Sequence, residues 1–234
     1  MQDTSSLYKQ ILSGEHWKEH RLVIGESGAQ TTVATTDIVV MNTYSGIFPE
    51  NMPVVGGCVA SEISATILRP KADIPRMCRV VPYVRLCNGE KQSEWIQKGV
   101  YFIDRNSCFG EDNELMEIHG FDAMLFSEAD FPSSNADWPR KDIDVVRDIA
   151  KDMDVTVDSR TVTIMNKGYM VPYPAEYSQR EVLGYLAAMY AGSFVMSDTG
   201  ELRLVQINGI PAETFYLTDH AGFVLTFGGD RINV

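Results

Sequence analysis

Three stretches of the chain place apolar residues at the spacing of an amphipathic helix. The clearest begins at Ser178, which forms the S-x-x-E pattern of a capping box with Glu181. In such a box the hydroxyl and the carboxylate each bond a backbone N–H that the first helical turn leaves unpaired. The apolar face of this helix consists of Val182, Leu183, Leu186, Ala187 and Tyr190. We expect the helix to stop at Gly192, because glycine readily adopts a left-handed conformation.

The other two stretches predict one short and one longer helix. The short helix covers 7–12, with Ser5 or Ser6 as its cap and Gly14 as its stop. The longer helix has an apolar face made of Ile143, Val145, Val146, Ile149, Ala150 and Met153.

Alternating apolar and polar residues predict strands elsewhere in the chain. Between 58 and 68 the apolar side chains fall largely on one face and the polar ones on the other, as in a half-buried strand. Further strands are expected at 21–24, 77–86, 95–103 and 115–119, with a strand pair or one long strand at 33–41 and a short helix at 121–129. Asn88-Gly89 favours a tight turn, although a longer loop towards Trp95 is open as an alternative. Strands without alternating helices favour a small antiparallel barrel or sandwich.

The pattern divides the chain into two domains. We predict a mostly β fold: a small antiparallel β-barrel domain with a short N-terminal helix over 1–130, followed by an α+β domain over 140–208. The boundary falls in Phe131–Pro139, which is rich in Pro, Ser and Asn. The second domain is predicted as two helix-plus-hairpin units, with hairpins at 155–165 about Asp158 and at 193–207 about Gly200. Residues 209–234 are the start of a further β segment, as at the front of a longer protein.

Composition and charge limit the possible partners. The 234 residues carry a net charge of -12, which opposes tight binding to nucleic acid or to an anionic membrane surface. The sequence has no signal peptide and no apolar run long enough to span a bilayer, so we expect a soluble chain made in the cytosol. The cysteines have neither zinc nor disulfide spacing and are expected to be free, mostly buried thiols: Cys58, Cys78, Cys87 and Cys108.

Two groups of residues raise the question of a metal site. His16 and His20 could share a metal on a helix, but they supply only two ligands. A run of aspartates suggests calcium, yet it lacks the glycine and terminal glutamate of the calcium-binding loop: Asp142, Asp144, Asp148, Asp152, Asp154 and Asp158. We interpret the histidines as surface or interface residues and the aspartates as a solvated helix face, and we expect no metal and no other cofactor.

Candidate catalytic residues do not form a complete set. Asp104, Glu117 and Asp122 could serve as the acid and base of a glycosidase, but acidic residues at strand ends commonly serve turns. A thiol of Cys108 or Cys58 with His119 as base has no signature around either cysteine. The Gly56-Gly57 and Gly228-Gly229 pairs lack the frame of a phosphate loop and are interpreted as turns or close backbone contacts. We therefore predict that the chain is not an enzyme.

The loop from Tyr44 to Gly57 is unusually apolar. Loops are normally polar and exposed, so its large apolar side chains predict a contact surface. These residues are the candidate subunit interface: Ile47, Phe48, Met52, Val54 and Val55. The alternative is that the loop folds back over one end of its own barrel.

Several segments, taken in their order, resemble the hub or tail-tip proteins of tailed bacteriophages and prophages. They are LYKQILSGEHWKEHRLVI at 7–24, VVGGCVASEISATI at 54–67, IPRMCRVVPYVR at 74–85, SEWIQKGVYFID at 93–104, MEIHGFDAML at 116–125 and EVLGYLAAMYAGSFVMSDTGELRLV at 181–205. None is a catalytic signature, and their order is the specific feature.

The resemblance implies a structural subunit that joins the tail tube to the tip by ring assembly. Its partners would be two further copies in a homotrimer, distal tail or tube proteins, the tape-measure protein and receptor-binding tip proteins. It would be located in the virion tail after assembly in the host bacterial cytoplasm. The alternative from the same resemblance is a carbohydrate-binding or peptidoglycan-degrading module of the tail tip.

Overall fold

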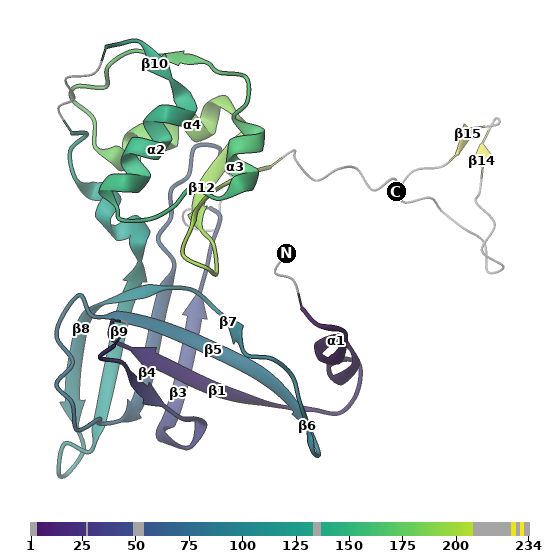
Figure 1. Ribbon diagram of the computed structural model, residues 1–234, viewed down its shortest axis with the longest axis vertical. Coiled ribbons are helices and arrows are strands. Elements are labelled where there is room, and N and C mark those ends of the chain that lie inside the picture. The colour runs from purple at the N-terminus through teal and green to yellow at the C-terminus, as the bar shows by residue number, and fades with distance from the viewer. Residues whose placement is uncertain are drawn as a thin grey trace.

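The computed structural model describes residues 4–26, 28–48, 54–132 and 137–207, with the backbone of 226–227 and 230–231. Figure 1 shows a large curved sheet at one end and a smaller group of helices and short strands at the other. No helix in the described part of the chain is long and apolar enough to cross a membrane.

The larger part is a nine-stranded antiparallel sheet, which confirms the prediction of a mostly β chain. The strand order is β2-β1-β5-β8-β9-β4-β3, and β6 and β7 also pair with β5. The strands are β1 (Trp17–Ile24), β2 (Thr31–Val33), β3 (Ile38–Tyr44), β4 (Glu62–Leu68), β5 (Arg79–Asn88), β6 (Lys91–Gln92), β7 (Ile96–Gln97), β8 (Tyr101–Phe109) and β9 (Leu115–Asp122).

The inner face of this sheet forms one of the two hydrophobic cores. Strand β4 shows the predicted alternation, since Ile63, Ala65 and Ile67 are buried and the residues between them are not. Both end strands reach the same core, through Val33 of β2 and Met41 of β3, so the sheet is curled. Among the described residues, however, no pairing joins β2 to β3, so the sheet is open there and the predicted small barrel is not confirmed.

Two segments with predicted strands are each divided in the structure, which for 33–41 agrees with the alternative of a strand pair. The segment 33–41 is interrupted by the 3-10 helix η1 (Thr35–Asp37), where the Thr35 hydroxyl bonds both the N–H and the carbonyl of His20 at 2.9 and 2.7 Å. This side chain takes the place of the ladder bonds that a continuous strand would form. The segment 95–103 is broken at Gly99, whose φ of +126° is accessible to glycine, and its two halves belong to β7 and β8. The predicted turn at Asn88-Gly89 is confirmed, because Asn88 pairs with Lys91.

The smaller part packs helices against a two-stranded hairpin around the second core. Its elements are η3 (Ala123–Glu128), β10 (Arg140–Lys141), α2 (Asp142–Asp152), α3 (Ser159–Ile164), β11 (Met170–Val171), α4 (Gln179–Met189), β12 (Gly192–Met196) and β13 (Leu202–Gln206). The core contains the fully buried side chains of Ile149, Leu183, Leu186 and Phe194. Of the further β segment predicted at 209–234 the structure describes only the backbone of β14 (Thr226–Phe227) and β15 (Asp230–Arg231), which pair with each other, and the rest lies outside the described residues.

The helix caps follow the sequence closely. Ser5 caps α1 (Ser6–Leu12), and Ser178 with Glu181 forms the predicted capping box of α4. The predicted stop of α4 is wrong by one residue: Ala191 has the positive φ of +49°, and Gly192 begins β12. A Cβ on Gly192 would lie 2.6 Å from the carbonyl oxygen of Val205, so this glycine allows two strands to approach rather than ending the helix.

The hairpin predicted at 155–165 is wrong. This region forms the helix α3, because the Asp158 carboxylate accepts the N–H of Arg160 at 2.8 Å and acts as an N-cap rather than a turn residue. The Thr161 hydroxyl in turn accepts the N–H of Leu204 at 2.8 Å and ties α3 to β13. The second hairpin, around Gly200, is confirmed by the pairing of β12 with β13.

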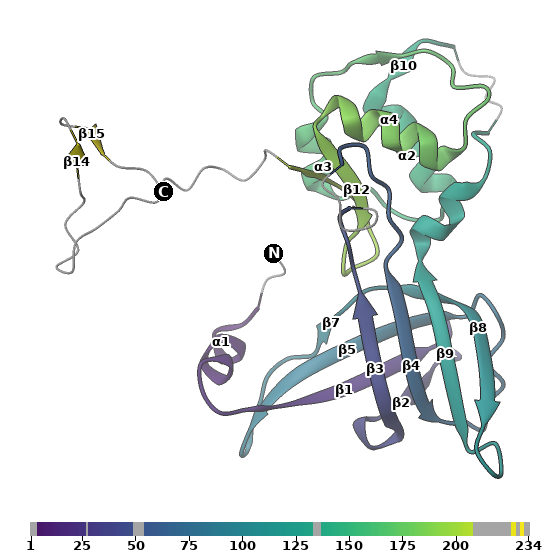
Figure 2. The same cartoon turned by 180° about the vertical axis from the view of Figure 1, so that it is seen from behind.

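The chain between β3 and β4 joins the two parts. Its residues 56–58 lie beside α4 and β12 (Figures 1 and 2). Gly56 donates its N–H to the Gly192 carbonyl at 2.8 Å, and Phe194 donates to Gly57 at 2.9 Å. A Cβ on Gly56 would lie 2.8 Å from the Gly184 carbonyl oxygen, which confirms the close backbone contact expected of this glycine pair.

Candidate interaction surface

The apolar segment after β3 is exposed on both sides of its undescribed residues. Ile47, Val54 and Val55 are 40%, 45% and 47% exposed, and Phe48 is half-buried. Met52 lies outside the described residues. Ile47 lines an open hollow of about 670 Å³ beside the β12–β13 hairpin. The described members of the candidate interface are therefore available to a partner.

The exposed apolar residues continue from this segment onto α4. Gly56, next to Val55, packs against Gly184 and Ala188 on the outer side of that helix. Beyond this contact lie the exposed side chains of Tyr185 and Met189, and the ring of Tyr177 meets the ring of Tyr185 edge to face at 5.3 Å. We group these exposed residues, which adjoin the Gly56 contact or lie on the outer side of α4, as the apolar surface: Val54, Val55, Tyr177, Tyr185, Ala188 and Met189.

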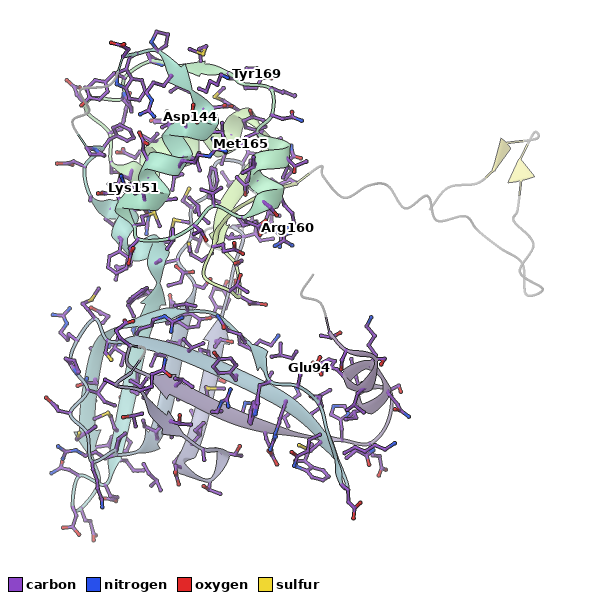
Figure 3. The ribbon with its side chains drawn as sticks, viewed as in Figure 1. Glu94, Asp144, Lys151, Arg160, Met165 and Tyr169 are labelled. Carbon is purple, nitrogen blue, oxygen red and sulfur yellow. The ribbon has the colours of Figure 1, made fainter. Side chains whose placement is uncertain are left out.

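The outer side of α2 provides a contrast within the same core. It carries charged residues, among them Asp144, which pairs with Arg147 at 2.9 Å, and Lys151 (Figure 3). That side is the normal solvated face of an amphipathic helix, whereas α4 has apolar residues on both sides. A helix that is apolar all round is usually buried on both sides. This signal was present in the sequence at Tyr185 and Met189, and our sequence interpretation missed it.

Strand β3 extends the uncharged region along the sheet. It is an end strand and has no charged residue from Ile38 to Tyr44. Val39 and Val40 are 60% and 49% exposed. End strands usually carry charges or prolines that prevent further pairing. The edge of β3 therefore also has the character of a contact surface.

The structure separates the candidate metal ligands. His20 belongs to strand β1 rather than a helix, so His16 lies about 13 Å along the chain from it by strand geometry. Burial lowers the pKa of His20. No group of three or more His, Cys, Asp or Glu side chains in the described ranges is arranged to hold a metal ion.

The aspartate run has structural partners. Two of its members are buried, which corrects the expectation of a wholly solvated face. Asp142 accepts the hydroxyl of Tyr190 and so joins the start of α2 to the end of α4. Asp158 caps α3 and pairs with Arg160, whose hydrogen bonds lower the pKa of the carboxyl.

The proposed acid and base residues do not meet in one site. Asp104 pairs with Arg76 at 2.8 Å. Glu117 and Asp122 are five positions apart on β9 and hence on opposite faces. Asp122 is 2% exposed, caps η3 and accepts the N–H of Ser61 at 2.8 Å. Burial raises its pKa to about 6. Asp122 thus links the sheet to the smaller part of the molecule.

The cysteines are free, as predicted, but only Cys87 is fully buried and the other three are half-buried. Burial raises the pKa of the Cys58 thiol to about 12, which keeps it protonated rather than nucleophilic. His119 faces Glu62 at 3.6 Å and lies opposite Arg105 in the sheet. Cys108 lies opposite Met116, so the structure does not pair it with His119.

Comparison with known proteins gives a likeness in structure alone. No protein-family model matches the sequence, and no curated protein matches it. The chain shares a fold with the 43 kDa tail protein of prophage MuSo2 from Shewanella oneidensis, with a TM-score of 0.50 and 11% identity over 80% of this chain and 52% of that one. The tail protein from Neisseria meningitidis MC58 gives a TM-score of 0.49 with 11% identity, over 79% of this chain and 50% of that one.

A third solved structure, a half-lidded Francisella PdpA-VgrG complex, gives a TM-score of 0.48 with 10% identity, over 81% of this chain and 31% of that one. The chain thus spans about half the length of the two tail proteins. At these identities the comparison with the MuSo2 protein establishes a shared fold.

Proposed function

We propose that the chain is a structural subunit of a phage tail tip or baseplate hub and joins the tail tube to the tip by ring assembly. The observation that carries the proposal is the apolar surface, which extends from Val54 and Val55 over the outer side of α4. Contiguous exposed apolar residues of this kind are typical of protein contact sites. The fold shared with a prophage tail protein supports placing that contact in a tail.

The composition of the apolar surface suits a permanent contact between proteins. Tyrosine and methionine are enriched at the centres of protein interfaces, and charged residues are depleted there. Tyr177, Tyr185 and Met189 meet that description, and the exposed Glu181, one turn before Tyr185 on α4, borders them. The predicted interface residues Ile47, Phe48, Met52, Val54 and Val55 are proposed as one part of this contact, and α4 as the other.

The wider assembly follows as part of the same proposal. The subunit forms a homotrimer and contacts distal tail or tube proteins, the tape-measure protein and receptor-binding tip proteins. Residues 1–130 act as the hub domain, 140–208 as a separate α+β domain, and 209–234 begin a further β segment. The protein acts by shape and contact rather than by catalysis, in a virion tail assembled in the host bacterial cytoplasm.

Electron microscopy with a cell-wall assay tests this proposal. The purified chain is expected to form closed rings in negative stain and to leave a suspension of purified peptidoglycan turbid. Single particles without rings, together with clearing of the suspension, would instead identify a hydrolytic module of the tail tip. Retention on peptidoglycan without clearing would identify a binding module.

A further inference from the structure

We propose that copies of this chain contact one another head to tail, with the arm of one copy receiving the acidic β8–β9 turn of the next. The arm is α1, β6 and β7 with the adjoining halves of β1 and β5. The turn is Gly110–Glu114. The inference rests on the proposed assembly function and names two surfaces that meet. In both ribbon views these surfaces lie at opposite ends of the large sheet (Figures 1 and 2).

The arm presents an arginine that is already held in place. The guanidinium carbon of Arg21 lies 4.6 Å from the ring centroid of Tyr83 and 4.5 Å from that of Trp95. Rings that stack on a guanidinium occupy its planar faces and leave the N–H groups along its edges. Among the described residues the Arg21 guanidinium has no ion pair, and its Nε atom is buried without a hydrogen-bond partner.

The neighbouring arginine, Arg85, has a carboxylate partner within the chain, and Arg21 has none among the described residues. Arg85 also lies over the Trp95 ring, at 4.5 Å, but it donates two hydrogen bonds to Glu19, at 2.6 and 2.8 Å. The charge of Arg85 is therefore balanced within the chain. Arg21 lies on the same face of β1 as Glu19 and keeps its positive charge, on a chain whose net charge is -12. A carboxylate from another molecule is the group that the terminal N–H groups of this half-buried side chain would bind, since its Nε atom is buried.

The β8–β9 turn supplies such carboxylates. Glu111, Asp112 and Glu114 are exposed, and the five residues of the turn contain no Lys or Arg. None of the three carboxylates forms an ion pair within the ranges that the structure describes. The guanidinium of Arg21 and the carboxylates of the turn, which have no ion pair among the described residues, are complementary between two copies.

Apolar residues border both surfaces and add a second complementary feature. Trp17 is 51% exposed and shares the outer face of β1 with Arg21. At the other end Phe109 and Leu68 are 43% and 44% exposed and flank Leu115 in neighbouring strands, directly beside the turn. An aromatic ring at each end next to opposite charges gives the contact an apolar centre with a charged rim.

Because the arm and the turn are different surfaces, this contact is heterologous. Heterologous contacts repeat from copy to copy and generate a ring where the rotation closes, whereas a contact between identical surfaces gives a dimer. The arm contact therefore provides a route to ring assembly that the apolar surface on α4 does not supply by itself.

Charge reversal in the full-length chain tests the inference. The turn variant Glu111→Arg/Asp112→Arg is expected to raise the dissociation constant for self-association at least tenfold, measured by sedimentation velocity. The arm variant Arg21→Glu is expected to do the same. Combining all three substitutions in one chain is expected to restore association, because the opposite charges again meet. The control Asp137→Arg/Asp154→Arg makes the same change in net charge at exposed residues of the smaller part and is expected to leave association unchanged.

The outcomes separate this inference from the function on which it rests. If the wild-type chain associates and the turn variant associates as the control does, the head-to-tail contact is overturned while the assembly function stands. Loss of association in the turn variant without recovery in the combined variant also overturns it, provided that circular dichroism shows the combined variant folded. A wild-type chain that does not associate at all overturns both.

Discussion

Tyr185 and Leu186 are adjacent on α4 and have opposite surroundings, which makes them a matched pair for testing the apolar surface. Tyr185 is 58% exposed, and Leu186 is 2% exposed in the core of the smaller part. We consider the double variant Tyr185→Gln/Met189→Gln, in which glutamine keeps good helix propensity and removes only outward-facing apolar groups. The partner variant is Leu186→Ala.

The structure sets the expected changes in the free energy of unfolding. Tyr185 makes one edge-to-face ring contact, with Tyr177 at 5.3 Å. Since such pairs contribute about 0.5–1.5 kcal/mol and this one is largely exposed, the double variant is expected to lose about 1 kcal/mol or less. Leu186→Ala is expected to lose about 2–5 kcal/mol, because it removes a fully buried side chain.

For assembly we expect the larger effect from the double variant at the surface and not from Leu186→Ala in the core. A tyrosine at the centre of an interface typically contributes about 2 kcal/mol or more to binding, so the double variant is expected to raise the dissociation constant roughly thirtyfold. Urea unfolding at low protein concentration measures the free energy of unfolding, and sedimentation velocity measures the dissociation constant for assembly. If the double variant loses several kcal/mol of stability and assembles like the wild type, α4 is a core helix only and the interface argument is refuted.

Three further predictions concern the joint between the two parts and the charge of the chain. The pKa of Asp122 is raised from 3.8 to about 6, so the folded state holds its proton more tightly than the unfolded state; the contribution of Asp122 to stability should fall by roughly 2 kcal/mol as pH rises from 4 to 6. Asp122→Asn should remove this fall, and identical pH profiles for the two proteins would show that Asp122 does not cause it. Gly56→Ala should lose about 1 kcal/mol or more beyond Gly89→Ala in thermal unfolding, since both have positive φ but only Gly56 would place a Cβ against a backbone oxygen. Duplex DNA should not bind tightly to a chain of net charge -12, and a sub-micromolar affinity at physiological salt by fluorescence anisotropy would contradict this.

Local signals in the sequence predicted the elements whose causes are local. The capping box at Ser178 and Glu181 and the alternation in β4 depend on residues within one or two turns or strand positions, and both are confirmed. Asp158 was assigned to a turn and forms an N-cap, because aspartate serves both purposes and only the following residues decide between them.

Features that depend on distant residues could not be predicted in the same way. The hydroxyl of Thr35 breaks a strand by bonding His20, fifteen residues earlier. The close approach at Gly192 arises from Val205 on the paired strand. The open sheet likewise depends on how far β2 extends towards β3, which no local pattern specifies.

The sequence predicted only the part of the candidate surface that depends on neighbouring residues. The apolar residues after β3 are visible in sequence as a loop that breaks the usual polarity of loops. Their continuation onto α4 required the contact between Gly56 and Gly184, which brings residues more than a hundred positions apart together. Tyr185 and Met189 were not assigned to either face of the predicted helix, and their exposure in the fold shows that they lie outside the core.

The mass of the purified chain in solution tests the central claim most directly. Multi-angle light scattering over a range of concentrations is predicted to show association towards a species of three times the 26.1 kDa chain mass. A mass of 26.1 kDa at every concentration would contradict assembly as the function of this protein.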